Sequence, residues 1–141
     1  MKGWLYMKES ENIARAWLRQ ATVDLDFAQN ALDNEFYSQA CFNAQQVAEK
    51  ALKALSYHRG DRFVTGHSLI NLARSLESSY PQILEYMRAI RRLNLYYIAT
   101  RYPDALAGSV PSDCFDREQA EEALALAEDI MSFAQSIILQ N

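Results

Sequence analysis

The sequence predicts an all-α fold, an up-and-down four-helix bundle with an additional short helix, and three observations support this. The 141-residue chain has the length of one domain, so we expect residues 1–141 to form a single helical domain. Half of its residues are hydrophobic, whereas only four glycines and three prolines interrupt it. Apolar side chains also recur at alternating spacings of three and four residues, the period of one helical face.

The first two predicted helices lie in the N-terminal half. Residues 10–33 carry one apolar stripe, with Ser10 suited to be the N-cap. A second stripe follows the break at Asn34 and ends before Gly60, a residue typical of the position after a helix. The opposite face of this second helix is polar, and it carries Ser38, Asn43, Gln46, Glu49, Lys50 and Lys53.

The C-terminal half contains a short third helix and two longer ones. Thr65 or Ser68 can cap the short helix, and Pro81 suits the first turn of the fourth helix, which should stop near Thr100. Residues 101–115 have no sustained period and predict a long loop, of the kind that often carries function. The last helix should open with a capping box, formed by Asp116 and Gln119.

Charge is unevenly distributed along the chain. Residues 50–103 contain nine Lys or Arg against three acidic residues, a local charge of +6, whereas the remainder carries −10. Such a segment can attract phosphates even though the net charge of the protein is −4. The alternative is that these charges only keep the helix surfaces solvated.

The cysteines and the N-terminus bear on the cellular compartment. Cys41 and Cys114 are too few for a disulfide framework and lack the spacing of a zinc site, so we expect two reduced thiols. The N-terminal residues have no apolar run long enough for a signal peptide, and no stretch approaches the roughly 20 apolar residues of a membrane span. We therefore expect a soluble cytoplasmic protein with no metal and no cofactor.

Three motifs carry a resemblance to a known family. They are AlaCysPheAsnAlaGlnGln followed by ValAlaGluLysAlaLeuLysAla at residues 40–54, GlyHisSerLeu at 66–69, and TyrIleAlaThrArgTyrProAsp at 97–104. In order and spacing, this sequence resembles the HEPN (higher eukaryote and prokaryote nucleotide-binding) family over nearly the whole chain.

The resemblance implies a helical bundle that often pairs into dimers. It also implies a minimal nucleotidyltransferase as a partner, because many HEPN domains are encoded beside one as toxin and antitoxin. Some members are ribonucleases that use an Arg followed a few residues later by a His, in the region that corresponds here to Arg101 and beyond. No His follows His67 in this sequence, so that motif is absent and we assign no catalytic residue.

A similar spacing occurs elsewhere, because four residues separate Arg62 from His67. This pair precedes the third helix, where the family shows its HisSerLeu opening, so we interpret the spacing as accidental. His67 is then expected to cap the third helix or to make a structural hydrogen bond. It should be dispensable for any cleavage of RNA.

The candidate ligand-binding residues after the fourth helix are Arg101, Tyr102 and Asp104. An Arg can hold a phosphate with two hydrogen bonds, and a Tyr ring can stack on a base. The alternative is structural: Tyr102 packs under the long loop, and Arg101 pairs with Asp104 or Glu49.

Further candidates for nucleic-acid binding are basic residues of the positive segment: Lys50, Arg88, Arg91 and Arg92. Tyr96 and Tyr97 lie beside these arginines and could form a stacking platform for a single strand. Tyrosines in this position more often anchor a helix contact or a dimer interface. Near Lys50, an i,i+4 pair between Glu49 and Lys53 is a sufficient structural reason for the charges.

Three functions remain open on the sequence alone. The first is a binding and interaction module that dimerises, engages a nucleotidyltransferase and holds a nucleotide or RNA. The second is a metal-independent toxin ribonuclease that uses Arg101, or Arg62 with His67. The third is a structural dimeriser without a ligand.

Overall fold

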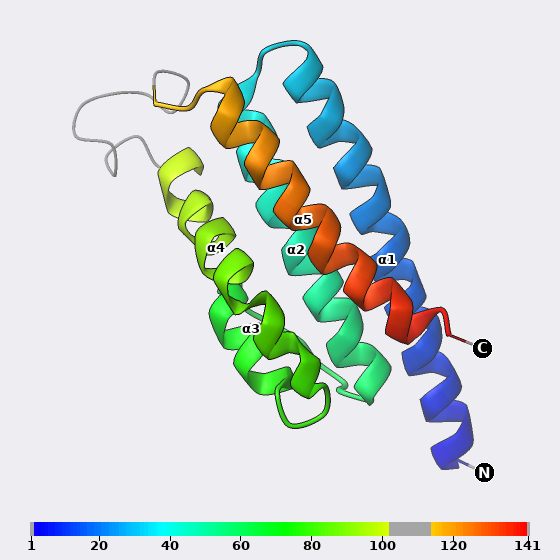
Figure 1. Ribbon diagram of the computed structural model, residues 1–141. Coiled ribbons are helices and arrows are strands. Elements are labelled where there is room, and N and C mark those ends of the chain that lie inside the picture. The colour runs from blue at the N-terminus through cyan, green and yellow to red at the C-terminus, as the bar shows by residue number, and fades with distance from the viewer. Residues whose placement is uncertain (1, 102–113, 141) are drawn as a thin grey trace.

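The structure, a computed structural model, describes residues 2–101 and 114–140, and these residues form helices and connecting segments without strands (Figure 1). The elements in chain order are α1 (Lys2–Asp33), α2 (Tyr37–Arg59), α3 (Leu69–Leu76), the 3₁₀-helix η1 (Pro81–Tyr86), α4 (Met87–Arg101) and α5 (Arg117–Ile138). The predicted all-α class is therefore confirmed.

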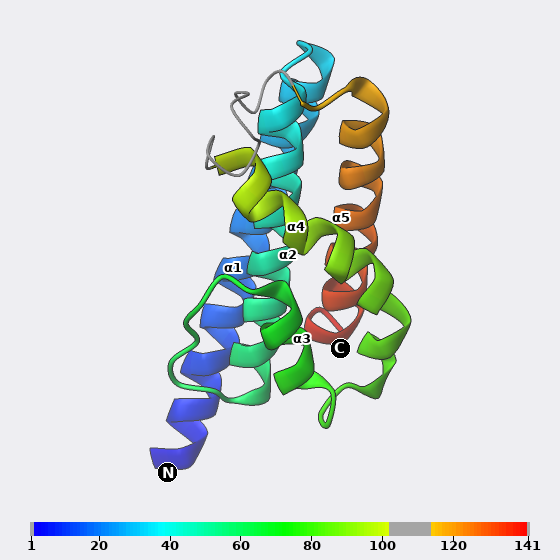
Figure 2. The ribbon, with the colours of Figure 1, turned by 90° about the vertical axis from the view of Figure 1, so that its left-hand side faces the viewer.

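Helix α2 lies in the centre of the bundle. It packs on α1 and α5, and also on α3 and α4 (Figures 1 and 2). Small residues let these axes approach closely: Ala40, Ala44, Ala48 and Ala51 have no solvent exposure. Because neighbours surround it, α2 buries side chains on almost every face.

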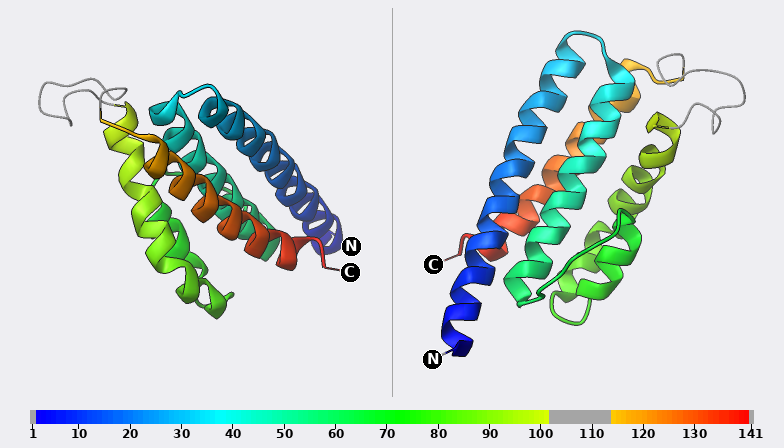
Figure 3. Two further views of the ribbon diagram at one scale, coloured as in Figure 1. Left: turned by 45° about the horizontal axis from the view of Figure 1, so that its top comes forward. Right: turned by 180° about the vertical axis from the view of Figure 1, so that it is seen from behind.

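The polar face of α2 is the first place where the structure differs from the sequence pattern. Ser38, Glu49 and Lys53 are buried, whereas the sequence grouped them with the polar residues of an outer face. The segment after the helix covers the part of this face around Glu49, because it runs back along the bundle from the end of α2 toward α3 and brings His67 to that carboxylate (Figure 3). Glu49 and Lys53 therefore need partners inside the protein.

Helix α1 begins earlier than predicted. Its described start is Lys2, so Ser10 lies in the interior of the helix and is not an N-cap, which corrects that prediction. Ser10 is buried, and its hydroxyl donates a hydrogen bond to the carbonyl of Tyr57 at 2.9 Å. A side chain that bridges two helices thus resembles a cap in sequence.

The ends of the shorter elements follow their local chemistry. Gly60 ends α2 with a φ of 112°, a left-handed conformation that favours glycine. Ser68 is the N-cap of α3 and accepts from the amide of Asn71, so the expectation that His67 caps this helix is wrong. Pro81 opens the 3₁₀-helix η1 instead of the first turn of α4.

Helix α5 opens as the sequence predicts. The carboxylate of Asp116 accepts from the amide of Gln119 at 2.8 Å, and the Gln119 side chain accepts from the amide of Asp116 at 3.0 Å. This capping box sets the start of the helix that packs on both α1 and α2.

Candidate functional site

Glu49 is the centre of a polar cluster in the middle of the bundle. Its side chain is only 5% exposed, and each carboxylate oxygen has a partner. Oε2 lies 3.3 Å from Nζ of Lys53, one turn along α2, and Oε1 lies 3.1 Å from Nδ1 of His67. We call Glu49, Lys53, His67 and Tyr97 the Glu49 cluster.

His67 is held firmly although its side chain is 59% exposed. Its ring stacks on Tyr97 of α4, with 5.2 Å between centroids and 12° between planes. A carboxylate only accepts hydrogen bonds, so Nδ1 carries the hydrogen that points at Glu49. In the neutral ring, Nε2 then remains as an acceptor.

The opposite end of the cluster is aromatic. Lys53 Nζ lies 5.5 Å from the centroid of the Trp17 ring, a cation–π contact that reaches α1. Trp17 stacks in turn on Tyr57, with 6.3 Å between centroids. The buried ammonium group of Lys53 is therefore compensated both by Glu49 and by a ring.

The structure places Arg101 close to this cluster along the chain. Arg101 is the last residue of α4, and Tyr97 lies one helical turn before it, so both positions share one helix face. Tyr102 and Asp104, the other two predicted residues of this set, lie outside the described residues. Glu49, one of the two partners that the structural alternative gives to Arg101, contacts Lys53 and His67.

The predicted basic residues do not form one patch. Lys50 forms an ion pair with Asp24 of α1, and its side chain is 20% exposed. Arg88, Arg91 and Arg92 are exposed on α4, and we call them the arginine row. Lys50 therefore faces α1, whereas the arginine row belongs to the helix at the opposite edge of the bundle (Figure 1).

The arginine row borders acidic groups. Arg92 forms an ion pair with Glu122 of α5. Arg88 and Arg92 line a groove of about 620 Å³ between α4 and α5, which also contains three carboxylates, those of Glu85, Glu122 and Asp129. These carboxylates reduce the positive potential that the arginines would offer to a phosphate.

The two tyrosines of α4 have different roles. Tyr96 packs edge-on against Phe115, with 5.7 Å between centroids, and burial raises the pKa of its hydroxyl above the usual value. Tyr96 therefore anchors α4 against the start of α5, as the structural alternative predicted. Tyr97 instead lies between His67 and Phe42 and belongs to the Glu49 cluster.

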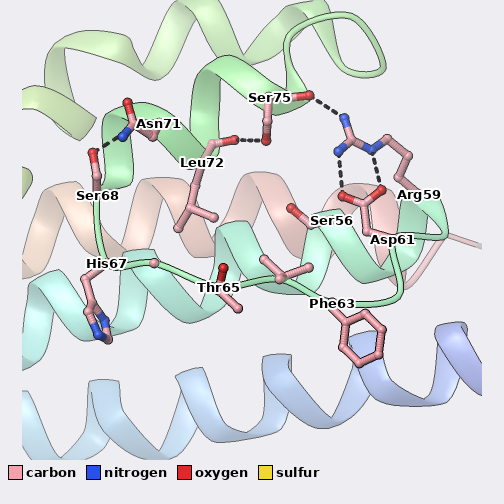
Figure 4. A pocket seen from close by; sticks show the side chains of 12 residues that line it. Ser56, Arg59, Asp61, Phe63, Thr65, His67, Ser68, Asn71, Leu72 and Ser75 are labelled. Carbon is pink, nitrogen blue, oxygen red and sulfur yellow. Dashed lines mark hydrogen bonds and ion pairs between the residues drawn. The ribbon is translucent and has the colours of Figure 1, made fainter.

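A second hollow, of about 470 Å³, lies between the end of α2, the following segment and α3 (Figure 4). Arg59 binds Asp61 at 2.6 Å and also donates to the carbonyl of Ser75, so the polar groups at this end satisfy one another. The ring of His67 points away from Ser68 and Asn71, toward the other side of the segment. His67 lines this hollow and also contacts Glu49, so the hollow borders the Glu49 cluster.

The described residues contain two free thiols and no group of three potential metal ligands. No three His, Cys, Asp or Glu side chains within this part of the chain are grouped as a metal site would require. Cys41 and Cys114 are both free thiols, and burial raises the pKa of Cys41 to about 12. Cys41 is therefore an unreactive core residue. None of the helices across residues 2–101 and 114–140 is both long and apolar enough to cross a bilayer.

The sequence predicted the pair of Glu49 with Lys53 inside this cluster, but it did not predict the contact with His67. The contact between Glu49 and His67 joins residues 18 positions apart in the chain. No local pattern indicates it, because the apolar residues of 47–55 share one helix face and Glu49, Lys50 and Lys53 lie on the opposite face.

Comparison with known proteins gives a consistent result. The family model of the HEPN domain matches residues 14–137. The candidate toxin MJ1304 of Methanocaldococcus jannaschii is 26% identical over 133 residues, which cover 89% of this chain and 88% of that protein.

Two solved structures extend this result. TT1696 from Thermus thermophilus is 42% identical, with a TM-score of 0.83, and covers 89% of this chain and 98% of its own. ST0689, an archaeal HEPN homologue, is 29% identical, with a TM-score of 0.73, and covers 89% of this chain and 97% of its own.

Proposed function

Because the chain belongs to the HEPN family, we propose that it is a cytoplasmic binding and interaction module of the toxin–antitoxin type, which holds a nucleotide or RNA and acts with a minimal nucleotidyltransferase. The similarity to a candidate toxin supports the toxin–antitoxin context. The nucleotidyltransferase follows from the family resemblance of the three motifs.

The observation that carries the binding function is the exposed imidazole of His67 on the ring of Tyr97. Two stacked rings at the surface offer a flat platform for a nucleobase. Arg101 follows one turn later and offers a bidentate phosphate ligand in the same part of the molecule. Tyr102 and Asp104 complete this proposed site, with the phenol as a second stacking group.

The remaining basic residues contribute less to binding than Arg101 does. The arginine row and Lys50 would contribute a long-range positive field from the segment 50–103 and few direct contacts. Lys50 and Arg92 already have carboxylate partners, Asp24 and Glu122. Of these four residues, Arg88 and Arg91 are thus the better ligands for a phosphate backbone.

The binding test is a fluorescence-anisotropy titration of labelled single-stranded RNA and of labelled ATP. Arg101→Gln and Tyr97→Leu should each weaken binding about tenfold, because each removes one phosphate or stacking contact. Phe63→Leu is the matched control, since its ring is 87% exposed in the segment beside His67. Equal affinities for the parent, Arg101→Gln and Tyr97→Leu would refute the site.

The partner test is co-expression with a minimal nucleotidyltransferase encoded beside this gene. A stable complex on size-exclusion chromatography, with relief of any growth defect that this chain causes alone, is the expected result. Absence of such a gene, or two proteins that elute separately at micromolar concentration, would leave the chain without the proposed partner.

One observation favours a second function, cleavage of RNA without a metal. The buried carboxylate of Glu49 contacts Nδ1 of His67 and so orients the imidazole, whereas Nε2 does not contact it. A histidine that acts as a general base is commonly oriented by a carboxylate in this way. Arg101 would stabilise the charge that develops on phosphorus. This interpretation contradicts the expectation that His67 is dispensable, so one experiment separates the two.

The experiment is incubation of labelled RNA with the parent, His67→Gln and Glu49→Gln, in the presence of EDTA. Under the first proposal none of the three cleaves RNA. If the parent cleaves and His67→Gln does not, while its circular dichroism spectrum is unchanged, the ribonuclease function is supported. A preparation purified from a strain without the gene controls for contaminating nucleases.

A further inference from the structure

Two helices hold the chain where the connecting segment meets α3. From α2, Glu49 contacts the ring of His67, and the fully buried Gln45 donates to the backbone carbonyl of His67 at 3.5 Å. From α4, the side chain of Asn94 accepts a hydrogen bond from the amide of Leu69 at 2.7 Å. The exposed ring of His67 is therefore carried on a backbone that is fixed from both sides.

Asn94 uses only one half of its side-chain amide in this contact. The amide of Leu69 is a donor, so the atom that faces it is the Asn94 oxygen, which determines where the NH2 group lies. Across residues 2–101 and 114–140, that NH2 group donates no hydrogen bond. Asn94 is only partly buried, and among the described residues that are not exposed, only His58 has a buried side-chain nitrogen or oxygen without a partner. Nδ2 of Asn94 is therefore accessible from solvent.

Asn94 also lies on the face of α4 that carries the proposed binding site. Tyr97, whose ring stacks on His67, follows three residues later, and Arg101 follows after four more. Spacings of three and four place these positions on one stripe of the helix. At a rise of about 1.5 Å per residue, Asn94 and Arg101 are about 10 Å apart along the axis, which leaves room for a base near one and a phosphate near the other.

On the basis of the proposed function, we propose that Asn94 is a further ligand-binding residue of this site, whose NH2 group donates to the edge of a nucleobase that stacks on His67 and Tyr97. The edge of every nucleobase carries a carbonyl oxygen or a ring nitrogen that accepts such a hydrogen bond. The contact with Leu69 fixes the Asn94 amide before a ligand arrives, so less conformational freedom is lost on binding.

The alternative role of Asn94 is purely structural, because its oxygen satisfies an amide in the first turn of α3 that has no partner within the helix. The substitution Asn94→Asp separates the two roles. A carboxylate still accepts from the amide of Leu69, so the start of α3 is preserved, but an ionised carboxylate has no hydrogen to donate. A structural Asn94 tolerates this change, whereas a ligand-binding Asn94 does not.

The first test is an anisotropy titration of labelled single-stranded RNA with the full chain. Asn94→Asp should weaken binding about tenfold, because one hydrogen bond to the ligand is lost. Leu95→Asp is the matched control, since it adds the same charge at the next position of α4, on a side chain that is 70% exposed. The control should weaken binding less than about threefold, because salt screens an exposed charge. Thermal unfolding followed by circular dichroism should give both variants the melting temperature of the parent.

Competition with neutral nucleosides tests whether Asn94 contacts the base. Uridine and adenosine have no phosphate, so the charge of the variant repels them little. Both should displace labelled RNA from the parent, and both should require about tenfold higher concentrations with Asn94→Asp. Free ribose, which has no base, should displace it from neither. In an NMR titration of the parent, the side-chain NH2 signal of Asn94 should shift as uridine is added, a readout that does not depend on how any variant folds.

Equal effects of Asn94→Asp and Leu95→Asp on RNA binding would overturn this inference. So would an Asn94 signal that uridine leaves unmoved, or nucleosides that compete no better than ribose or equally well with parent and variant. In each of these cases the proposed function stands if Arg101→Gln and Tyr97→Leu still weaken the binding of RNA. A parent that binds neither RNA nor ATP overturns the proposed function and the role of Asn94 together.

Discussion

The two charged regions of the bundle differ in what surrounds them. In the Glu49 cluster, Glu49 and Lys53 are 5% and 9% exposed, and their charges are satisfied by each other, by His67 and by a ring. In the arginine row, Arg92 is 48% exposed and its partner Glu122 is 43% exposed. The Glu49 cluster is thus part of the protein interior, whereas the arginine row lies on the surface. The contribution of an ion pair to stability is therefore not constant, because it depends on how far the two charged groups are buried away from water.

The largest expected difference concerns stability. Lys53→Met leaves the carboxylate of Glu49 buried without its cation, so we expect a loss of about 3 kcal/mol or more in the free energy of unfolding. Arg92→Met breaks the exposed pair and should cost less than about 1 kcal/mol. Urea unfolding followed by circular dichroism measures both. Equal losses in the two variants would show that burial does not make the Glu49–Lys53 pair more important for stability than the exposed pair.

The reactivity of the two thiols offers a second contrast between buried and exposed surroundings. Burial raises the pKa of Cys41 from 9.0 to about 12, so the thiolate needed for alkylation is essentially absent at pH 8. Cys114 is exposed. Iodoacetamide at pH 8 should therefore add one label to the native protein, at Cys114, as mass spectrometry of the peptides would show. Rapid labelling of Cys41 would contradict the buried position of this part of α2.

The salt dependence of RNA affinity tests whether the arginine row contacts the RNA backbone. If RNA binds, replacing Arg88, Arg91 and Arg92 together with Gln should flatten the slope of log affinity against log salt. Removal of one phosphate interaction should lower the slope by about 0.7 for a single strand. Because Arg92 already pairs with Glu122, we expect the change to correspond to about two such interactions. Anisotropy titrations at four salt concentrations measure it, and an unchanged slope would place the RNA on another surface.

The smallest expected effect is that of His67 on stability. His67→Ala removes a hydrogen bond to Glu49 and a stacked ring, but the side chain is 59% exposed and water can take its place beside the carboxylate. We expect a loss of about 1 kcal/mol, well below that of Lys53→Met. Urea unfolding gives the value. A loss as large as that of Lys53→Met would make His67 a structural partner of the buried pair and weaken its assignment to a binding surface.

The sequence itself determined the local features of this protein. Helical periodicity predicted every long helix, and the capping box of Asp116 and Gln119 and the left-handed Gly60 follow from chemistry within a few residues. It also indicated the family, through motifs that lie in α2, before α3 and at the end of α4. Caps and helical stripes depend only on near neighbours along the chain, so a single sequence contains the information they need.

Only the tertiary structure decided which of the polar residues are buried. Glu49 and Lys53 lie on what the sequence pattern indicates as the outer face of a helix, and they become interior because the segment 60–68 returns along α2 and brings His67 to Glu49. Ser10 lies inside α1 because the helix begins before it, and its hydroxyl donates to the carbonyl of Tyr57, 47 residues away. The path of a connecting segment depends on how all the helices pack together, and no local pattern records it.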